Sequence, residues 1–117
     1  MGVFSSYEGE VLHALLATRY DREQIEGVIK DARFVSLEHT GVGYFLTVAH
    51  PLIPAARAVC SDTTPQGRFQ DVQCGFVLFL EQGELTFECF SYPGSSNRDG
   101  VVPEDIRELP LAIEVIA

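Results

Sequence analysis

Three glutamates gather around one predicted β-hairpin, and closely spaced carboxylates are groups that can perform acid–base chemistry. Glu81 and Glu84 flank the turn at 82–83, and Glu88 follows Glu84 at an even spacing that puts both on one face of a strand. Paired carboxylates act as general acid and general base in glycoside hydrolysis. That chemistry needs a sugar cleft with aromatic platforms, and a chain of 117 residues without Trp offers little room for one.

Two other interpretations of these carboxylates stay open. They can form a solvated outer face that keeps the hairpin soluble. They can also form an acidic patch, with the aromatic residues Phe90 and Tyr92 nearby, that meets a basic partner. We therefore take Glu81, Glu84, Glu88 and Tyr92 as the candidate partner-binding residues.

The histidines and cysteines are the next groups that could do chemistry, as zinc ligands or as a nucleophile with its base. His39, His50 and a cysteine are conceivable zinc ligands, but no pair has the short spacing that is typical of structural zinc sites. The three cysteines, Cys60, Cys74 and Cys89, form no CxxC pair and lie in apolar stretches. This pattern favours reduced, buried thiols and predicts a cytoplasmic location.

Glycine and serine motifs of known enzyme classes are missing or lie in the wrong context. The chain has no G-x-S-x-G sequence, and the G-S-S run at 94–96 lies in a turn-rich stretch. The G-V-G run at 41–43 matches part of a dinucleotide-binding fingerprint, but it lies between two predicted strands and opens no helix that could bind a phosphate. We predict no catalytic residue, no cofactor-binding residue, no metal ligand and no cofactor.

Composition and charge limit the classes of partner. Eight Lys and Arg against seventeen Asp and Glu give a formal net charge of −9, which argues against binding to nucleic acid phosphates. The apolar run at 76–80 is far shorter than a membrane span, and the N-terminus lacks the basic residue and apolar core of a signal peptide. Length and composition predict a single domain, 1–117.

The first third of the chain has the period of two helices. Ser5 and Glu8 have the spacing of a capping box, and apolar residues at 11–16 recur at one-face helical spacing. Asp21 is the predicted N-cap of the second helix. Gly27 inside this helix costs about 1 kcal/mol relative to Ala, which indicates either a marginal helix or a close packing contact.

From residue 34 onward the period changes from that of helices to that of strands. We expect strands at 35–40, 44–49, 57–61, 76–80, 85–92 and 111–116, and an exposed loop at 62–71. The strand at 35–40 should be half-buried, the apolar strand at 76–80 central and buried on both faces, and the last strand at an edge. This order indicates an α+β fold, with two N-terminal helices packed on an antiparallel β-meander of about five or six strands.

Two stretches resemble a group of small, uncharacterised bacterial α+β proteins. The TGVGYF run at 40–45 resembles their TGVGF(F/Y) turn. Residues 75–85, running on to Glu88 and Tyr92, resemble their GFxLFIExGxLxxLExxxY hairpin. Some members of this group look like immunity proteins of interbacterial toxin systems. The resemblance implies the fold and an inhibitory role, and it implies no catalytic residue.

Two functions from different classes remain open. The first is a small acidic cytosolic protein-binding module, in its specific form an immunity-type inhibitor that charge steers onto a basic toxin domain. The second is a small enzyme or ligand-binding domain with a pocket between helices and sheet, beside His39 and His50. Its lining would be aromatic: Tyr44, Phe45, Phe76, Phe79, Phe87, Phe90 and Tyr92. A homodimer through an exposed strand edge is compatible with either function.

Overall fold

The computed structural model describes residues 2–61, 64–69, 72–91 and 105–116. Its elements in chain order are α1 (Ser6–Leu16), α2 (Arg22–Asp31), β1 (Arg33–His39), β2 (Gly43–Ala49), β3 (Ala58–Cys60), β4 (Thr64–Phe69), β5 (Val72–Glu81), β6 (Glu84–Ser91), the 3₁₀-helix η2 (Ile106–Glu108) and β7 (Ala112–Ile116). The predicted α+β fold, two N-terminal helices on an antiparallel sheet, is confirmed, and the sheet has seven strands.

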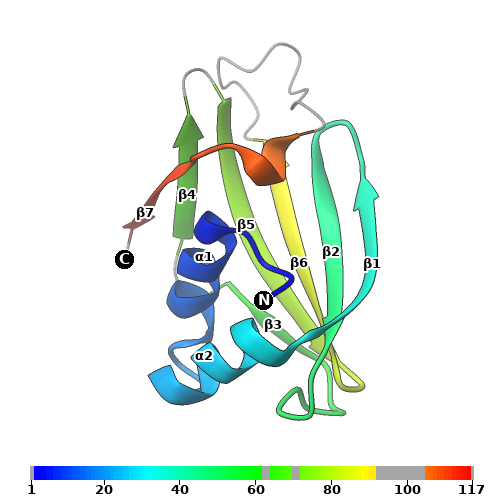
Figure 1. Cartoon of the computed structure of the whole chain (residues 1–117). Coiled ribbons are helices and arrows are strands. Elements are labelled where there is room, and N and C mark those ends of the chain that lie inside the picture. Colours follow the sequence, from blue (N-terminus) through cyan, green and yellow to red (C-terminus); the bar gives the residue numbers. More distant parts are fainter. Residues whose placement is uncertain (1, 62–63, 70–71, 92–104, 117) are drawn as a thin grey trace.

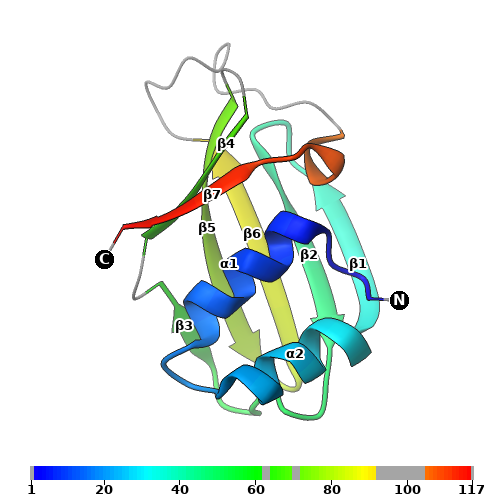
Figure 2. The same ribbon diagram turned by 60° about the vertical axis from the view of Figure 1, so that its left-hand side comes forward.

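The sheet is antiparallel throughout. Its strands run in the order β1-β2-β6-β5-β4-β7, and the short β3 also pairs with β5. The strand β6 lies between β2 and β5, so the order departs from a simple meander. Both α-helices lie on the same face of the sheet, and β7 forms an edge as predicted (Figures 1 and 2).

Local caps begin both helices. At α1 the Ser5 N–H donates to Glu8 Oε1 at 2.7 Å, which is one half of the predicted capping box. At α2 both halves form, because Asp21 Oδ1 accepts from the Gln24 N–H at 2.8 Å and Gln24 Oε1 accepts from the Asp21 N–H at 3.0 Å. A Cβ on Gly27 would meet nothing within 4 Å, so no close packing contact explains this glycine.

One core fills the space between the helices and the sheet. Three rings lie at its centre: Tyr44 and Phe87 are stacked with centroids 6.0 Å apart, and Phe76 lies 5.6 Å from Phe87. The buried apolar residues of the helices and the three central strands are Tyr7, Val11, Leu12, Leu15, Leu16, Ile25, Val28, Tyr44, Leu46, Val48, Cys74, Phe76, Leu78, Leu80, Leu85, Phe87 and Cys89. Each large aliphatic or aromatic side chain contributes roughly 1.5–3 kcal/mol by leaving water.

The strand β5 is central, as predicted, but it is buried on one face only. Phe76, Leu78 and Leu80 are buried towards the helices, whereas Val77 and Phe79 on the opposite face are half-buried. The prediction of burial on both faces is wrong because both α-helices pack on the same side of the sheet.

The predicted loop at 62–71 contains a strand in its described part. β4 pairs with β5 on one side and with β7 on the other. Pro65, which has no N–H to donate, lies opposite Val115 and comes one residue before Gln66, where the register with β5 begins. Gly67 lies close to Phe76 and Ile113, where a Cβ would come within 3.1–3.2 Å of both side chains. The glycine in this segment therefore reflects tight packing against the sheet.

The strand β1 is the second edge, and the prediction that it is half-buried is wrong. All seven residues, Arg33–His39, are exposed. A β-bulge between Phe34 and Ser36 interrupts the alternation of side chains. The helices cover the central strands and leave this edge uncovered (Figure 2).

Candidate functional site

The three glutamates predicted from the sequence come together on the sheet face opposite the helices. Glu81 and Glu84 are direct partners across the β5–β6 hairpin, and Glu88 lies on the same face of β6 as Glu84. Gln82 and Gly83 form the predicted turn with φ angles of 51° and 78°, as a type I′ hairpin turn requires. Even spacing and hairpin pairing are therefore sufficient to bring these carboxylates to one surface.

Strand pairing arranges this surface, which we call the open face, in three neighbouring cross-strand rows. The rows are Glu38, Phe45, Glu88 and Val77; Ser36, Thr47, Thr86, Phe79 and Val59; and Arg33, Ala49, Glu84 and Glu81. Thr47 and Thr86 form a hydrogen bond of 3.0 Å between their hydroxyls. The open face thus combines an apolar and hydroxyl-bearing centre with carboxylates at several positions.

The open face is acidic and its carboxylates are available to a partner. The central strands β2, β5 and β6 contain no Lys or Arg, and the cation of the three rows is Arg33 of the edge strand β1. Within the described part of the chain, Glu81, Glu84 and Glu88 make no hydrogen bond or ion pair. A cation of another molecule could therefore bind these glutamates without displacing a partner within the described chain.

Among the three glutamates Glu81, Glu84 and Glu88, Glu88 has the surroundings least favourable to a charged carboxylate. It is half-buried and lies between Phe45 and Val77 in the same row. Burial raises the pKa of Glu88 above the ordinary glutamate value, because the charged form loses water. A positive charge placed beside Glu88 would offset this loss and favour the carboxylate.

A groove of about 310 Å³ opens at the hairpin end of the open face. It is lined by Arg57, Phe79, Leu80, Glu81, Gln82, Glu84 and Thr86. The chain before β3 holds the turn in place: Gln82 N–H donates to the Ala55 carbonyl at 3.1 Å, and Gly83 N–H donates to the Pro54 carbonyl at 3.2 Å. Backbone hydrogen bonds thus fix the geometry of Glu81 and Glu84.

The sheet separates the aromatic residues that were predicted to line one pocket. Tyr44, Phe76 and Phe87 are buried in the core on the helix side. Phe45, Phe79 and Phe90 are half-buried on the open face. The described aromatic residues therefore do not enclose a common cavity, and Tyr92 lies outside the described residues.

The histidines are not brought together. His39 lies in β1 opposite Tyr44 at the start of β2, and His50 follows the end of the same seven-residue strand. Roughly 20 Å of strand separates them. The His39 Nδ1 accepts from the Gly41 N–H, and the His50 Nδ1 accepts from the Leu52 N–H, both at 3.1 Å. Among the described residues, no three His, Cys, Asp or Glu side chains gather as metal ligands would.

The three cysteines are buried and form no disulfide with one another, as predicted. Cys74 and Cys89, on neighbouring strands, form a thiol–thiol hydrogen bond. That bond and burial raise the pKa of Cys89 well above the ordinary thiol value. The same hydrogen bond lowers the pKa of Cys74, whereas Cys89 remains protonated and is a poor nucleophile.

The sequence analysis missed a buried polar network on the helix side. Glu8 is fully buried, and its two carboxylate oxygens accept from Arg107 Nε at 2.8 Å and Arg107 Nη2 at 2.9 Å. The Tyr44 hydroxyl donates to the same carboxylate at 2.6 Å and lies 2.7 Å from the Tyr7 hydroxyl. The only sequence signal was the capping position of Glu8, because nothing local connects that residue to Arg107.

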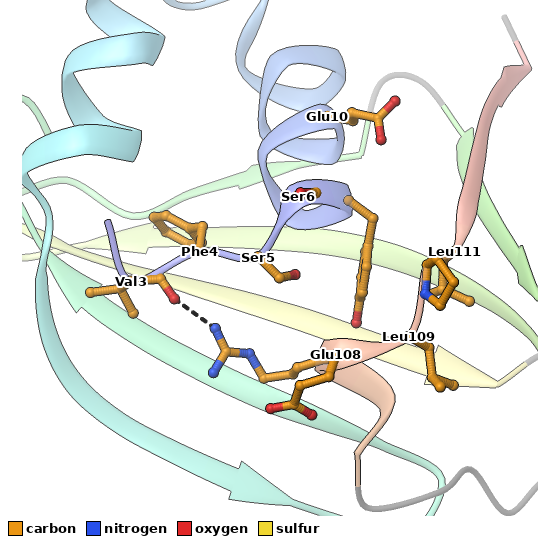
Figure 3. A pocket seen from close by; sticks show the side chains of 11 residues that line it. Val3, Phe4, Ser5, Ser6, Glu10, Glu108, Leu109 and Leu111 are labelled. Atoms are coloured by element: carbon orange, nitrogen blue, oxygen red, sulfur yellow. Dashed lines mark hydrogen bonds between the residues drawn. The ribbon is translucent and has the colours of Figure 1, made fainter. Parts of the chain in front are cut away.

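Two residues of the network, Tyr7 and Arg107, line a groove of about 630 Å³ between the start of α1 and the segment 107–111 (Figure 3). Arg107 Nη2 also donates to the Val3 carbonyl at 2.8 Å, which fixes the N-terminal segment (Figure 3). Burial raises the pKa of Tyr44 far above the ordinary tyrosine value, so its hydroxyl stays a donor. No histidine or cysteine of the described chain lines this groove. Arg107 is already bound to Glu8, so we interpret its contacts as stabilising the fold.

His39 contributes to a cavity of only about 40 Å³, together with Leu37, Tyr44, Ile106 and Arg107. Ligand pockets are typically about 300–1,000 Å³, so this space is too small for a substrate. No described helix has the length and apolar character needed to cross a membrane. Comparison with protein-family models, curated proteins and solved structures finds no match to this chain.

Proposed function

We propose that this chain is an acidic protein-binding module that uses the open face to bind a basic protein, and that it acts as an immunity-type inhibitor by covering the basic site of a toxin domain. The observation that carries the proposal is the arrangement of Glu81, Glu84 and Glu88 on one sheet face. They have no cationic partner within the described chain, and they lie beside half-buried aromatic residues.

The apolar centre of the open face supplies the contact area that a stable complex needs. Phe45, Phe79 and Phe90 are already half-buried, and Val59 is exposed beside them. Aromatic residues are enriched in the cores of protein interfaces, whereas charged residues form the rim and set the orientation. Binding would complete the burial of these rings.

The carboxylates supply steering and orientation. An acidic surface attracts a basic cleft over several ångströms and raises the association rate, and salt weakens this effect. Glu88 has a further role, because an arginine or lysine of the partner would offset the unfavourable burial of its carboxylate. The net charge of −9 acts in the same direction over longer distances.

The test compares three forms of the chain as bait in an extract of the native host. They are the unaltered chain, an open-face variant with Glu84→Arg and Glu88→Arg, and a helix variant with Glu23→Arg and Asp31→Arg. Glu23 and Asp31 are exposed on α2, and both variants change the net charge by the same amount. We expect a basic protein to be retained by the unaltered chain and the helix variant, and to be lost by the open-face variant.

Association rates of the captured protein, measured against salt concentration, make the test quantitative. We expect the open-face variant to associate at least about tenfold more slowly than the helix variant. Equal association rates for the two variants would show that the partner does not bind the open face.

Co-expression separates the inhibitory role from binding. The captured protein should arrest growth when expressed alone, and the unaltered chain should restore growth where the open-face variant does not. A captured protein that is harmless on its own would contradict the immunity role and leave the binding role intact.

A further inference from the structure

The exposed edge of β1 has an unusual amount of apolar surface. Phe34, Val35 and Leu37 expose 51%, 39% and 45% of their surface. In the described part of the chain β1 pairs only with β2, so its other side has no strand partner. Proteins commonly protect such edges with charge, proline, a β-bulge or a covering segment, because an unprotected edge recruits another strand. β1 has a bulge between Phe34 and Ser36 and charges at Arg33 and Glu38, so only a partner strand with complementary charges can pair with it.

The backbone at this edge is oriented for pairing. The Thr40 N–H donates to the Gly43 carbonyl at 2.9 Å, which sets the alternation of hydrogen bonds between β1 and β2. Counting back from Thr40, the backbone groups of Leu37 point away from β2. Beyond the bulge, Phe34 lies opposite Val48, and Leu37 lies opposite Leu46, two residues earlier in β2. The backbone groups of Phe34 therefore also point away from β2.

The side chains of β1 are complementary to a second copy of the same strand. Antiparallel pairing with Phe34 of one copy opposite Leu37 of the other also brings Arg33 opposite Glu38. Arg33 and Glu38 both belong to the open face, because they pair with Ala49 and Phe45 of β2.

Phe34 and Leu37 both belong to the helix side, because they pair with Val48 and Leu46. Each contact therefore joins like faces, apolar with apolar and cation with anion. A shift by one residue would set Phe34 opposite Glu38 and join opposite faces of the two sheets, which a pleated sheet does not permit.

We propose that two copies of this chain associate through β1 about a twofold axis, with Arg33 opposite Glu38 and Phe34 opposite Leu37, each contact occurring twice. The two sheets then form one continuous antiparallel sheet, and the two open faces become one surface. The interface is small, because it consists chiefly of one strand edge, so association is reversible and sensitive to single charges. This association does not depend on the proposed function.

Charge exchange tests the register directly. Sedimentation velocity over a concentration series should show a monomer–dimer equilibrium for the unaltered chain. Arg33→Glu alone and Glu38→Arg alone each replace two attractive contacts with two repulsive ones, so each should weaken the dimer about tenfold or more. The double variant restores the attraction with its sign reversed and should recover the dimer.

A mixture of the two single variants provides the sharpest result. One chain then carries glutamate at 33 and 38 and the other carries arginine at both, so the mixture should form a heterodimer although neither variant self-associates. Arg22→Glu on α2 is the matched control, because Arg22 is exposed and begins α2, at the end of the helix away from its connection to β1. Circular dichroism of each variant checks that it is folded.

Two outcomes would overturn the inference. One is an unaltered chain that stays monomeric up to about millimolar concentration, where even weak interfaces associate. The other is a dimer whose stability is the same in both single variants as in Arg22→Glu, because such a dimer would use another surface.

Discussion

Glu8 and Arg107 lie 99 residues apart in the chain and are joined by two hydrogen bonds, from Arg107 Nε and Nη2 to the two carboxylate oxygens. The contact connects the first helix to η2, and Tyr44 of β2 donates to the same carboxylate. The first helix and η2 are thus attached to β2 through one buried carboxylate.

Removing the arginine should destabilise the fold strongly. The Glu8 side chain is fully buried and the Arg107 side chain is 20% exposed. Arg107→Leu leaves a buried carboxylate without its cation, and we expect a loss of about 3–5 kcal/mol in urea unfolding. Arg22→Leu, at an exposed position of α2, is the control and should change stability by about 0.5 kcal/mol or less.

The pair can be distinguished from two independent effects by a double-mutant cycle. Glu8→Gln alone should also destabilise, because it removes the charge that faces Arg107. The variant with both substitutions should lose less than the sum of the two single losses. Strict additivity would mean that the two side chains do not act on each other.

We expect the Glu88 carboxylate to lower the stability of the fold and to favour binding of a basic partner. Burial raises its pKa in the folded state, so the folded protein binds the proton more tightly than the unfolded chain does. The resulting stabilisation is present below the unfolded pKa of about 4.3 and is lost as pH rises through the folded value.

Glu88→Gln removes the ionisable group, so no stability is lost as pH rises. The substitution should therefore raise the midpoint of thermal unfolding at pH 7, by an amount that shrinks as pH falls towards 4. Glu114→Gln, an exposed glutamate of β7, is the control. The same substitution at Glu88 should weaken partner binding. A Glu88→Gln variant that is less stable than the unaltered chain at pH 7 would contradict the raised pKa of Glu88.

The cysteines should be unreactive in the native protein. All three thiols are buried, and the pKa of Cys89 is raised by its hydrogen bond with Cys74 and by burial. A chromogenic disulfide reagent at pH 8 should label none of them in the time that it labels all three in denaturant. Rapid reaction of one thiol in the folded protein would indicate an accessible cysteine.

Two glycine-to-alanine substitutions should change stability in opposite directions. Gly83 has φ of 78° in the hairpin turn, so Gly83→Ala should cost about 1–2 kcal/mol through backbone strain. Gly27 lies inside α2, where an added methyl group would meet no heavy atom within 4 Å, so Gly27→Ala should gain about 1 kcal/mol. Chemical denaturation measures both, and each serves as the control for the other.

Features that depend on neighbours in sequence were correctly predicted. The Asp21 cap needs only Gln24, three residues later, and the hairpin at 82–83 needs two positive φ angles between strands. The common face of Glu84 and Glu88 follows from the two-residue repeat of a strand. Each of these signals is complete within a few residues, so no knowledge of the rest of the chain is required.

Features that depend on distant residues appeared only in the tertiary structure. The segment at 64–69 is polar and interrupted by proline and glycine, and it becomes a strand because β5 and β7 supply hydrogen bonds on both sides. Glu8 finds Arg107 only when the chain has folded. The exposure of β1 follows from where the helices lie, because an alternating pattern shows that a strand has two faces but not how much of either is covered.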